Sequence, residues 1–210
     1  MAVRPLTRDD CAATADLHVR HLADGLFPRL GRRFVRRWHE TFVESRHACG
    51  HVAVGTDGEL LGFVVAATDQ RSYVTFTLRT ARVSLVWRGA LAMLGRPRVA
   101  ALFVRTRLRA YWARLRRPVA TAPGGPRTAV VHAIVTVPAS RGTGVGRLLL
   151  DTVEEDVRAS GTECIELLSQ DGAHGGADFY RRLGWDEGSS FVNRDDRTMV
   201  RFSRRVTGAR

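Results

Sequence analysis

The residues with the most distinctive chemistry form a glycine-rich stretch in the second half of the chain. Ile134-Val-Thr-Val-Pro138 has the β-branched composition of a buried strand, and the next eight residues, Ala-Ser-Arg-Gly-Thr-Gly-Val-Gly, end at Gly146. Glycines at 142, 144 and 146 let backbone N–H groups approach a ligand closely, because glycine has no Cβ. A helix is expected to begin at Val145, and helix N-termini attract anions. The stretch therefore predicts a site for a pyrophosphate group.

The spacing of these glycines does not match two other known types of phosphate-binding loop. A dinucleotide-binding loop needs Gly-x-Gly-x-x-Gly directly after the strand, but here four residues precede the first glycine and residue 147 is Arg. A nucleoside-triphosphate loop needs Gly-Lys followed by Ser or Thr, and the chain contains no lysine. A glycine turn without a ligand remains the alternative, although three glycines at a helix start cost stability.

The glycine stretch lies within an alternation of predicted strands and helices. Asp57-Gly58 between two β-rich runs predicts a hairpin turn, and apolar residues at helical spacing, such as Phe34 and Trp38, predict helices. The alternation indicates one α/β or α+β domain. In chain order we predict a strand at 3–5, a helix at 11–22, a break at 26–28, a helix at 31–45, strands at 51–55 and 60–67, helices at 80–94 and 98–116, a connector at 121–126, a strand at 129–137, a helix at 145–160, a strand at 164–168, a helix at 177–183, a strand from 185 and a last strand at 198–204.

Composition excludes several classes of protein. The 210 residues are 44% hydrophobic, which is enough for one core, so intrinsic disorder is not expected. Cys11, Cys49 and Cys164 are odd in number and far apart, which predicts a reducing cytoplasm and no structural zinc. The chain has neither a signal-peptide-like apolar core nor a run of 18 apolar residues. We therefore expect a cytoplasmic protein that is soluble or peripheral to a membrane.

The net charge of +12 is concentrated in one segment. Thirteen arginines and no acidic residue lie between Arg71 and Arg127, whereas the rest of the chain has 20 arginines against 21 acidic residues. Within this segment, the predicted helix at 98–116 has an apolar stripe beside a stripe of arginines. The rest of the chain is therefore close to neutral.

Two motifs in the right order resemble one family. Arg141-Gly-Thr-Gly-Val-Gly146 resembles the acyl-CoA pyrophosphate loop of the GNAT superfamily of N-acetyltransferases. Ala177-Asp-Phe-Tyr-Arg-Arg-Leu-Gly-Trp185 resembles that family's second signature. The resemblance covers about residues 3–67 and 129–206, and it implies the GNAT fold, a mixed, mostly antiparallel twisted sheet flanked by helices. It further implies one domain over 1–206 with a helical, arginine-rich insertion at 71–127 between the third and fourth strands.

The resemblance also implies a donor site for acetyl-CoA without a metal. In that fold the sheet splays beside the fourth strand, where exposed backbone groups, here around Val135 and Val137, would pair with the pantetheine arm. The family often has an asparagine seven residues before its tyrosine. This sequence has Ala173 there, so Asp171 is the expected substitute. The other implied donor-binding positions are Thr136, Arg141, Gly142, Thr143, Gly144, Val145, Gly146 and Arg147.

Three residues are candidates for proton transfer. Tyr180 matches the family tyrosine that acts as general acid, and we expect Phe179 beside it to supply the core contact. Glu166 lies where several members of the family have a catalytic glutamate. His132 is the rival base, and strand alternation predicts that it shares a face with Ile134. The alternatives are a buried aromatic, a solvated glutamate, a hydrogen-bonded core histidine, and a water chain in place of a dedicated base.

The leading hypothesis is an enzyme that transfers an acetyl group from acetyl-CoA to a primary amine of an unidentified acceptor. The alternative is a non-catalytic acyl-CoA-binding module whose basic segment engages a membrane, nucleic acid or protein. For the segment at 71–127, three roles remain open: packing on the core, homodimer formation and contact with an anionic membrane surface. Nucleic acid ranks last, because no base-reading motif is present.

Overall fold

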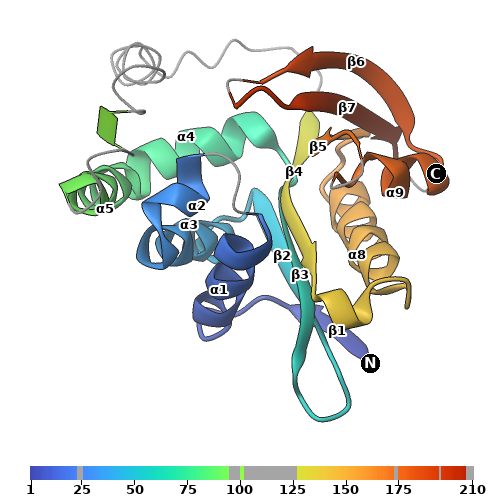
Figure 1. Ribbon diagram of the computed structural model, residues 1–210, viewed down its shortest axis with the longest axis horizontal. Coiled ribbons are helices and arrows are strands. Elements are labelled where there is room, and N and C mark those ends of the chain that lie inside the picture. The colour runs from blue at the N-terminus through green and yellow to red at the C-terminus, as the bar shows by residue number, and fades with distance from the viewer. Residues whose placement is uncertain (23–25, 95–99, 102–126, 173–174, 194, 207–210) are drawn as a thin grey trace.

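The computed structural model describes residues 1–22, 26–94, 100–101, 127–172, 175–193 and 195–206. Its strands form one seven-stranded sheet in the order β1-β2-β3-β4-β5-β7-β6 (Figure 1). Every neighbouring pair is antiparallel except β4 with β5, which confirms the predicted mixed, mostly antiparallel sheet. The strands are β1 (Ala2–Pro5), β2 (Ala48–Val54), β3 (Leu60–Ala67), β4 (Thr128–Thr136), β5 (Cys164–Gln170), β6 (Asp186–Val192) and β7 (Thr198–Arg205).

Helices cover both faces of the sheet (Figure 1). On one face, α8 (Val145–Ala159) and α9 (Ala177–Arg182) lie over a core that includes Leu149, Ile165 and Phe202. The opposite face has a second core, covered by α1 (Cys11–His21), α2 (Leu26–Leu30), α3 (Arg32–Glu44), α4 (Gln70–Thr80) and α5 (Arg82–Leu94).

The two central parallel strands stay together over a short distance only. β4 and β5 pair at three positions, from Thr128 with Cys164 to Val130 with Glu166. Beyond them β4 continues beside β3, and β5 continues beside β7. The sheet therefore splits into a β1–β4 half and a β5–β7 half, and the last part of β4 has backbone groups without a strand partner on its β5 side.

Most predicted elements are present within a few residues of their predicted bounds, with two differences. A short helix, α2, forms across the predicted break, and Pro28 is tolerated because N–H groups in a first helical turn have no intrahelical acceptor anyway. A separate helix, α4, precedes the helix predicted from Thr80. Its start is fixed by Asp69, whose carboxylate accepts hydrogen bonds from the N–H groups of Arg71 and Ser72.

The predicted helix at 98–116 and the connector at 121–126 lie outside the described residues, apart from 100–101. Within the described part of the chain, no helix combines the length and the apolar composition needed to cross a bilayer.

Candidate active site

The site is built around the unpaired edge of β4. The N–H of Val137 donates to the carbonyl of Leu61 at 2.9 Å. In an antiparallel ladder alternate residues point their backbone groups to the same side, so Val135, opposite Phe63, also points toward β3. The N–H and C=O of Ile134 and Thr136 then point toward the gap beside β5. The prediction that the free backbone groups belong to Val135 and Val137 is therefore corrected by one residue.

The glycine loop follows β4 and leads into α8. Gly142 and Gly144 have φ angles of +79° and +90°, a left-handed backbone that other residues adopt at a cost. A Cβ at either position would meet no atom within 4 Å, so the backbone conformation, not space, requires glycine.

The first turn of α8 presents free N–H groups beside this loop. N–H groups at Val145, Gly146 and Arg147 have no intrahelical acceptor, and the turn contains no acidic residue to neutralise the helix dipole. An anion of pyrophosphate size fits this chemistry.

Gly146 brings three elements into close contact. A Cβ on Gly146 would lie 3.1 Å from Cζ of Phe179 on α9 and 3.7 Å from Cγ2 of Thr136 on β4. A larger residue would push α8 away from α9 and from the end of β4. The packing of Phe179 thus connects the two sequence motifs in space.

Polar side chains around the loop are arranged as follows. Arg141 is exposed, and Arg147 is exposed with its Nε 3.8 Å from a carboxylate oxygen of Asp151. Thr143 donates its hydroxyl to the carbonyl of Ser140 at 2.8 Å, which stabilises the loop. Both guanidinium groups therefore remain accessible to phosphate oxygens.

Asp171, the predicted substitute for the family asparagine, lies at the end of β5. Its carboxylate accepts a hydrogen bond of 2.9 Å from Arg181, and this bond lowers the pKa of Asp171. Arg181 also binds Asp178 and Glu187. Asp171 thus fixes α9, and its contact with the pantetheine arm stays a prediction.

Tyr180 lies on α9, with its ring in the core of the α8 face. The residue is 6% exposed, and its ring packs against Trp185 and Phe202. Phe179 packs against this core as a partly buried residue, as expected, but Tyr180 is buried in the same core beside it. Burial raises the pKa of Tyr180, which keeps the phenol protonated at neutral pH, as a general acid requires.

The two candidate bases lie on the opposite face. Glu166 on β5 is half-buried and lies 3.3 Å from Arg201. It pairs with Val130 in a parallel ladder, where partners share a face. His132 follows two residues later on β4, so both candidate bases lie on the face that α1–α5 cover.

A β-bulge places His132 on the face of the sheet opposite to the one predicted for it. The register between β3 and β4 shifts where Val65 pairs with Ala133 and Ala66 pairs with Val131. The extra residue in β4 is His132, and an extra residue reverses the alternation beyond it. His132 therefore contacts aromatic rings of the α3–α4 side, while Thr136 packs toward α8.

His132 is held there by one hydrogen bond and an aromatic enclosure. Its Nε2 lies 2.8 Å from Oε1 of Gln70, so Nε2–H is the donor. Trp38, Phe42 and Tyr73 surround the ring. Burial lowers the pKa of His132 to about 4, so the imidazole is neutral at pH 7.

The chain is similar to known proteins in sequence and in fold. The sequence model of the acetyltransferase (GNAT) family matches residues 18–185. This chain belongs to the GNAT family of acetyltransferases. No curated protein matches it.

Solved structures of GNAT enzymes share the fold. An aminoglycoside 6'-N-acetyltransferase complexed with coenzyme A superposes with a TM-score of 0.61 at 14% identity, over 100% of this chain and 99% of that one. The same enzyme type from Enterococcus faecium gives 0.60 at 14% identity, over 100% and 99% of the two chains. The ribosomal-protein-S18-alanine N-acetyltransferase from Escherichia coli gives 0.58 at 11% identity, over 100% and 96%.

As a GNAT acyltransferase, this chain uses acetyl-CoA as its co-substrate, and the described residues fit that molecule. The N–H groups at the start of α8 suit the pyrophosphate. The free backbone of Ile134 and Thr136 suits an amide-bearing arm that lies along β4 like an added strand.

Three features of this GNAT enzyme were not predicted from the sequence. Ile134 could be found only with the strand register. Gln70 binds His132 from the first position of α4, and Asp69, a typical helix-capping residue, could have indicated that a helix starts there. An ion pair of 3.2 Å between Arg29 on α2 and Asp195 in the β6–β7 turn joins the two halves of the sheet, and it has no sequence signal.

Proposed function

We propose that the enzyme transfers an acetyl group from acetyl-CoA to a primary amine by direct attack. The observation that supports this most is the free β4 backbone directly before an anion-binding glycine loop. Together they would hold the thioester with its carbonyl near the N–H groups of Ile134 and Thr136. Such N–H groups stabilise the negative charge that develops on the carbonyl oxygen.

Each proton in this reaction has a proposed path. The amine nitrogen attacks the carbonyl carbon, the C–S bond breaks, and the products are an amide and the thiol of coenzyme A. A base takes the proton that the nitrogen loses, and the neutral phenol of Tyr180 protonates the leaving sulfur.

Glu166 is the preferred base and His132 the rival. Glu166 is half-buried on the face opposite α8, so its carboxylate is accessible from solvent. His132 is fixed by Gln70, and its depressed pKa makes the imidazole a weak base. A water chain that ends at either residue is the third route.

The test is release of free coenzyme A from acetyl-CoA across a panel of amines. The panel includes aminoglycosides and peptides with a free N-terminal alanine. Two of the enzymes with a similar fold are named for an aminoglycoside and for an alanine of a protein. Turnover with one class identifies the acceptor type. Acetyl-CoA binding without turnover on any amine would favour the alternative, a non-catalytic acyl-CoA-binding module.

A matched glycine pair tests the donor loop. Gly144 and Gly58 both have left-handed φ angles, +90° and +79°, and open space where a methyl side chain would lie. Alanine at either position costs about 1 kcal/mol of stability. Only Gly144→Ala should raise the KM for acetyl-CoA, by about tenfold, because it distorts the N–H groups at the pyrophosphate. Equal KM values for both variants would contradict the assignment of the loop.

We further propose that residues 1–206 are one domain with an insertion at 71–127, and that this insertion meets an anionic membrane surface. Of the two described helices of the insertion, α4 runs outward from the sheet and α5 lies at the edge of the molecule (Figure 1). A homodimer through this surface is disfavoured, because two copies would bring arginines against arginines.

A further inference from the structure

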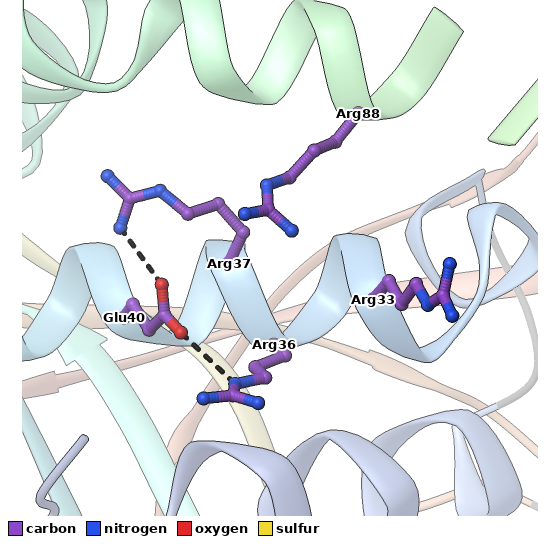
Figure 2. A pocket seen from close by; sticks show the side chains of 5 residues that line it. All are labelled: Arg33, Arg36, Arg37, Glu40 and Arg88. Carbon is purple, nitrogen blue, oxygen red and sulfur yellow. Dashed lines mark hydrogen bonds and ion pairs between the residues drawn. The ribbon is translucent and has the colours of Figure 1, made fainter. Parts of the chain in front are cut away.

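A basic pocket lies between α3 and α5, away from the acetyl-transfer site. Its volume is about 320 Å³. Figure 2 shows the side chains that line it, with Arg88 reaching from α5 toward Arg37 on α3. The lining residues are Arg33, Arg36, Arg37, Glu40 and Arg88.

The charges in this pocket do not balance. Glu44 binds Arg37 through two hydrogen bonds of 2.8 and 3.1 Å, and Glu40 binds Arg36 at 3.2 Å. Among the described residues, neither Arg33 nor Arg88 has a carboxylate partner. Two guanidinium groups without a carboxylate partner therefore line a concave site, which favours an anion that can accept several N–H bonds.

An apolar stripe on α5 flanks the pocket. Val83, Trp87 and Leu94 are 81%, 66% and 81% exposed. They follow one another at spacings of four and seven residues, so they lie on one side of the helix, next to Arg88. The opposite side of α5 packs on the core, where Gly89 allows Phe34 to come close.

We propose that α3 and α5 form a docking surface for an anionic lipid bilayer, in which the α3–α5 pocket binds the phosphate of a lipid headgroup and the apolar stripe enters the interface. This inference rests on the membrane contact proposed above. Guanidinium groups bind phosphate oxygens in a bidentate manner, and exposed tryptophan and aliphatic side chains partition into the headgroup boundary.

Charge and polarity favour lipid over other partners. Nucleic acid would satisfy the arginines, but it would leave Val83 and Leu94 in water. A second copy of the chain would cover the stripe, but it would place unpaired arginines together. An anionic bilayer satisfies both features, because its phosphates lie directly above its acyl chains.

The experiment is co-sedimentation of the full chain with vesicles of phosphatidylcholine alone and of phosphatidylcholine mixed with phosphatidylglycerol. We expect binding to the mixed vesicles that falls with added salt. The double variant Arg33→Gln, Arg88→Gln should bind about tenfold more weakly or worse. The matched control Arg182→Gln, Arg205→Gln removes two exposed arginines from α9 and β7, and its binding should fall by less than about threefold.

Two further measurements separate the parts of the proposal. Trp87→Ser should weaken vesicle binding, and the blue shift of tryptophan emission on vesicles should be lost in Trp87→Phe. Turnover of acetyl-CoA in detergent-free buffer should be unchanged in the Arg33→Gln, Arg88→Gln variant, so failure of the docking surface would leave the proposed acetyl transfer intact.

Several outcomes would overturn the inference. Equal binding of the pocket variant and its control would remove the pocket from the membrane contact. Equal binding to pure phosphatidylcholine vesicles, which contain phosphate but no net charge, would show that the surface does not require an anionic bilayer. Pocket-dependent binding of glycerol phosphate, without vesicle binding, would make it a site for a soluble phosphate. Pocket-dependent retention of duplex DNA, or dimerisation lost in Trp87→Ser, would show the partner to be nucleic acid or a second copy.

Discussion

The two faces of the sheet differ in the side chains that pack on them. The α8 face is packed with aliphatic side chains such as Leu149, Leu150 and Val153. The α1–α5 face buries three histidines, His18, His39 and His132, among aromatic rings. In the proposed reaction the first face would hold the donor at backbone groups and a helix end, whereas the second face carries both candidate bases.

The two regions also differ in how they are assembled. The proposed donor side is formed by one continuous stretch, β4, the glycine loop and the start of α8. The other side is assembled from α1, α3, α4 and β5, which are far apart in the sequence. Variants of the two faces should therefore fail in different ways.

The largest expected difference is in acid stability. Burial lowers the pKa of His18 to about 4, from an ordinary value of 6.5. The folded state binds fewer protons than the unfolded state between these values, so the stabilisation is complete above about pH 6.5 and is lost as the pH falls toward 4. The loss is about 3 kcal/mol for His18.

Denaturant unfolding at pH 7 and pH 4.5 measures this difference. His18→Asn, whose amide can donate to or accept from Nε2 of His39, should flatten the fall in the free energy of unfolding. An unchanged slope would show that the α1–α5 face does not determine acid sensitivity.

Removal of the base is the next largest effect, and it tests which residue of this face acts. Glu166→Gln should lower kcat/KM by about 10²-fold and abolish the rise of activity with pH, because an amide cannot accept the proton. His132→Ala should retain that rise. The reverse pattern in the two pH profiles would assign the base to His132, and retention of the rise in both would favour a water chain.

Tyr180→Phe tests the contribution of the α8 face to chemistry. We expect kcat to fall by about 10- to 100-fold with little change in the KM for acetyl-CoA, since only the proton donor is lost. No hydrogen bond contributes to the raised pKa of Tyr180, so the melting temperature should stay within about 1 °C. Unchanged turnover would remove Tyr180 from the mechanism.

The smallest expected effect concerns the ion pair that joins the two halves of the sheet. Arg29→Ala removes the 3.2 Å contact with Asp195, which is partly exposed. We expect the KM for the amine to rise by about two- to threefold, and less at high salt, because such pairs are weak and screened. A change in the KM for acetyl-CoA instead would place this pair on the donor side.

The sequence alone predicted the family, the strand order, most of the helices and the glycine loop before α8. These features depend on residues that are close in the chain. Gly142 and Gly144 have left-handed φ angles in the structure, and the apolar residues of α8 recur at helical spacing in the sequence. The sequence also located the surplus charge between Arg71 and Arg127.

Only the tertiary structure decided which atoms face the gap between β4 and β5. One extra residue in β4 moved His132 to the α3–α4 side, and the ladder with β3 assigned the free backbone to Ile134 instead of Val135. The burial of Tyr180 and the α3–α5 arginine pocket were equally hidden. Strand register, bulges and helix–helix contacts join residues that are distant in the chain, so no local pattern specifies them.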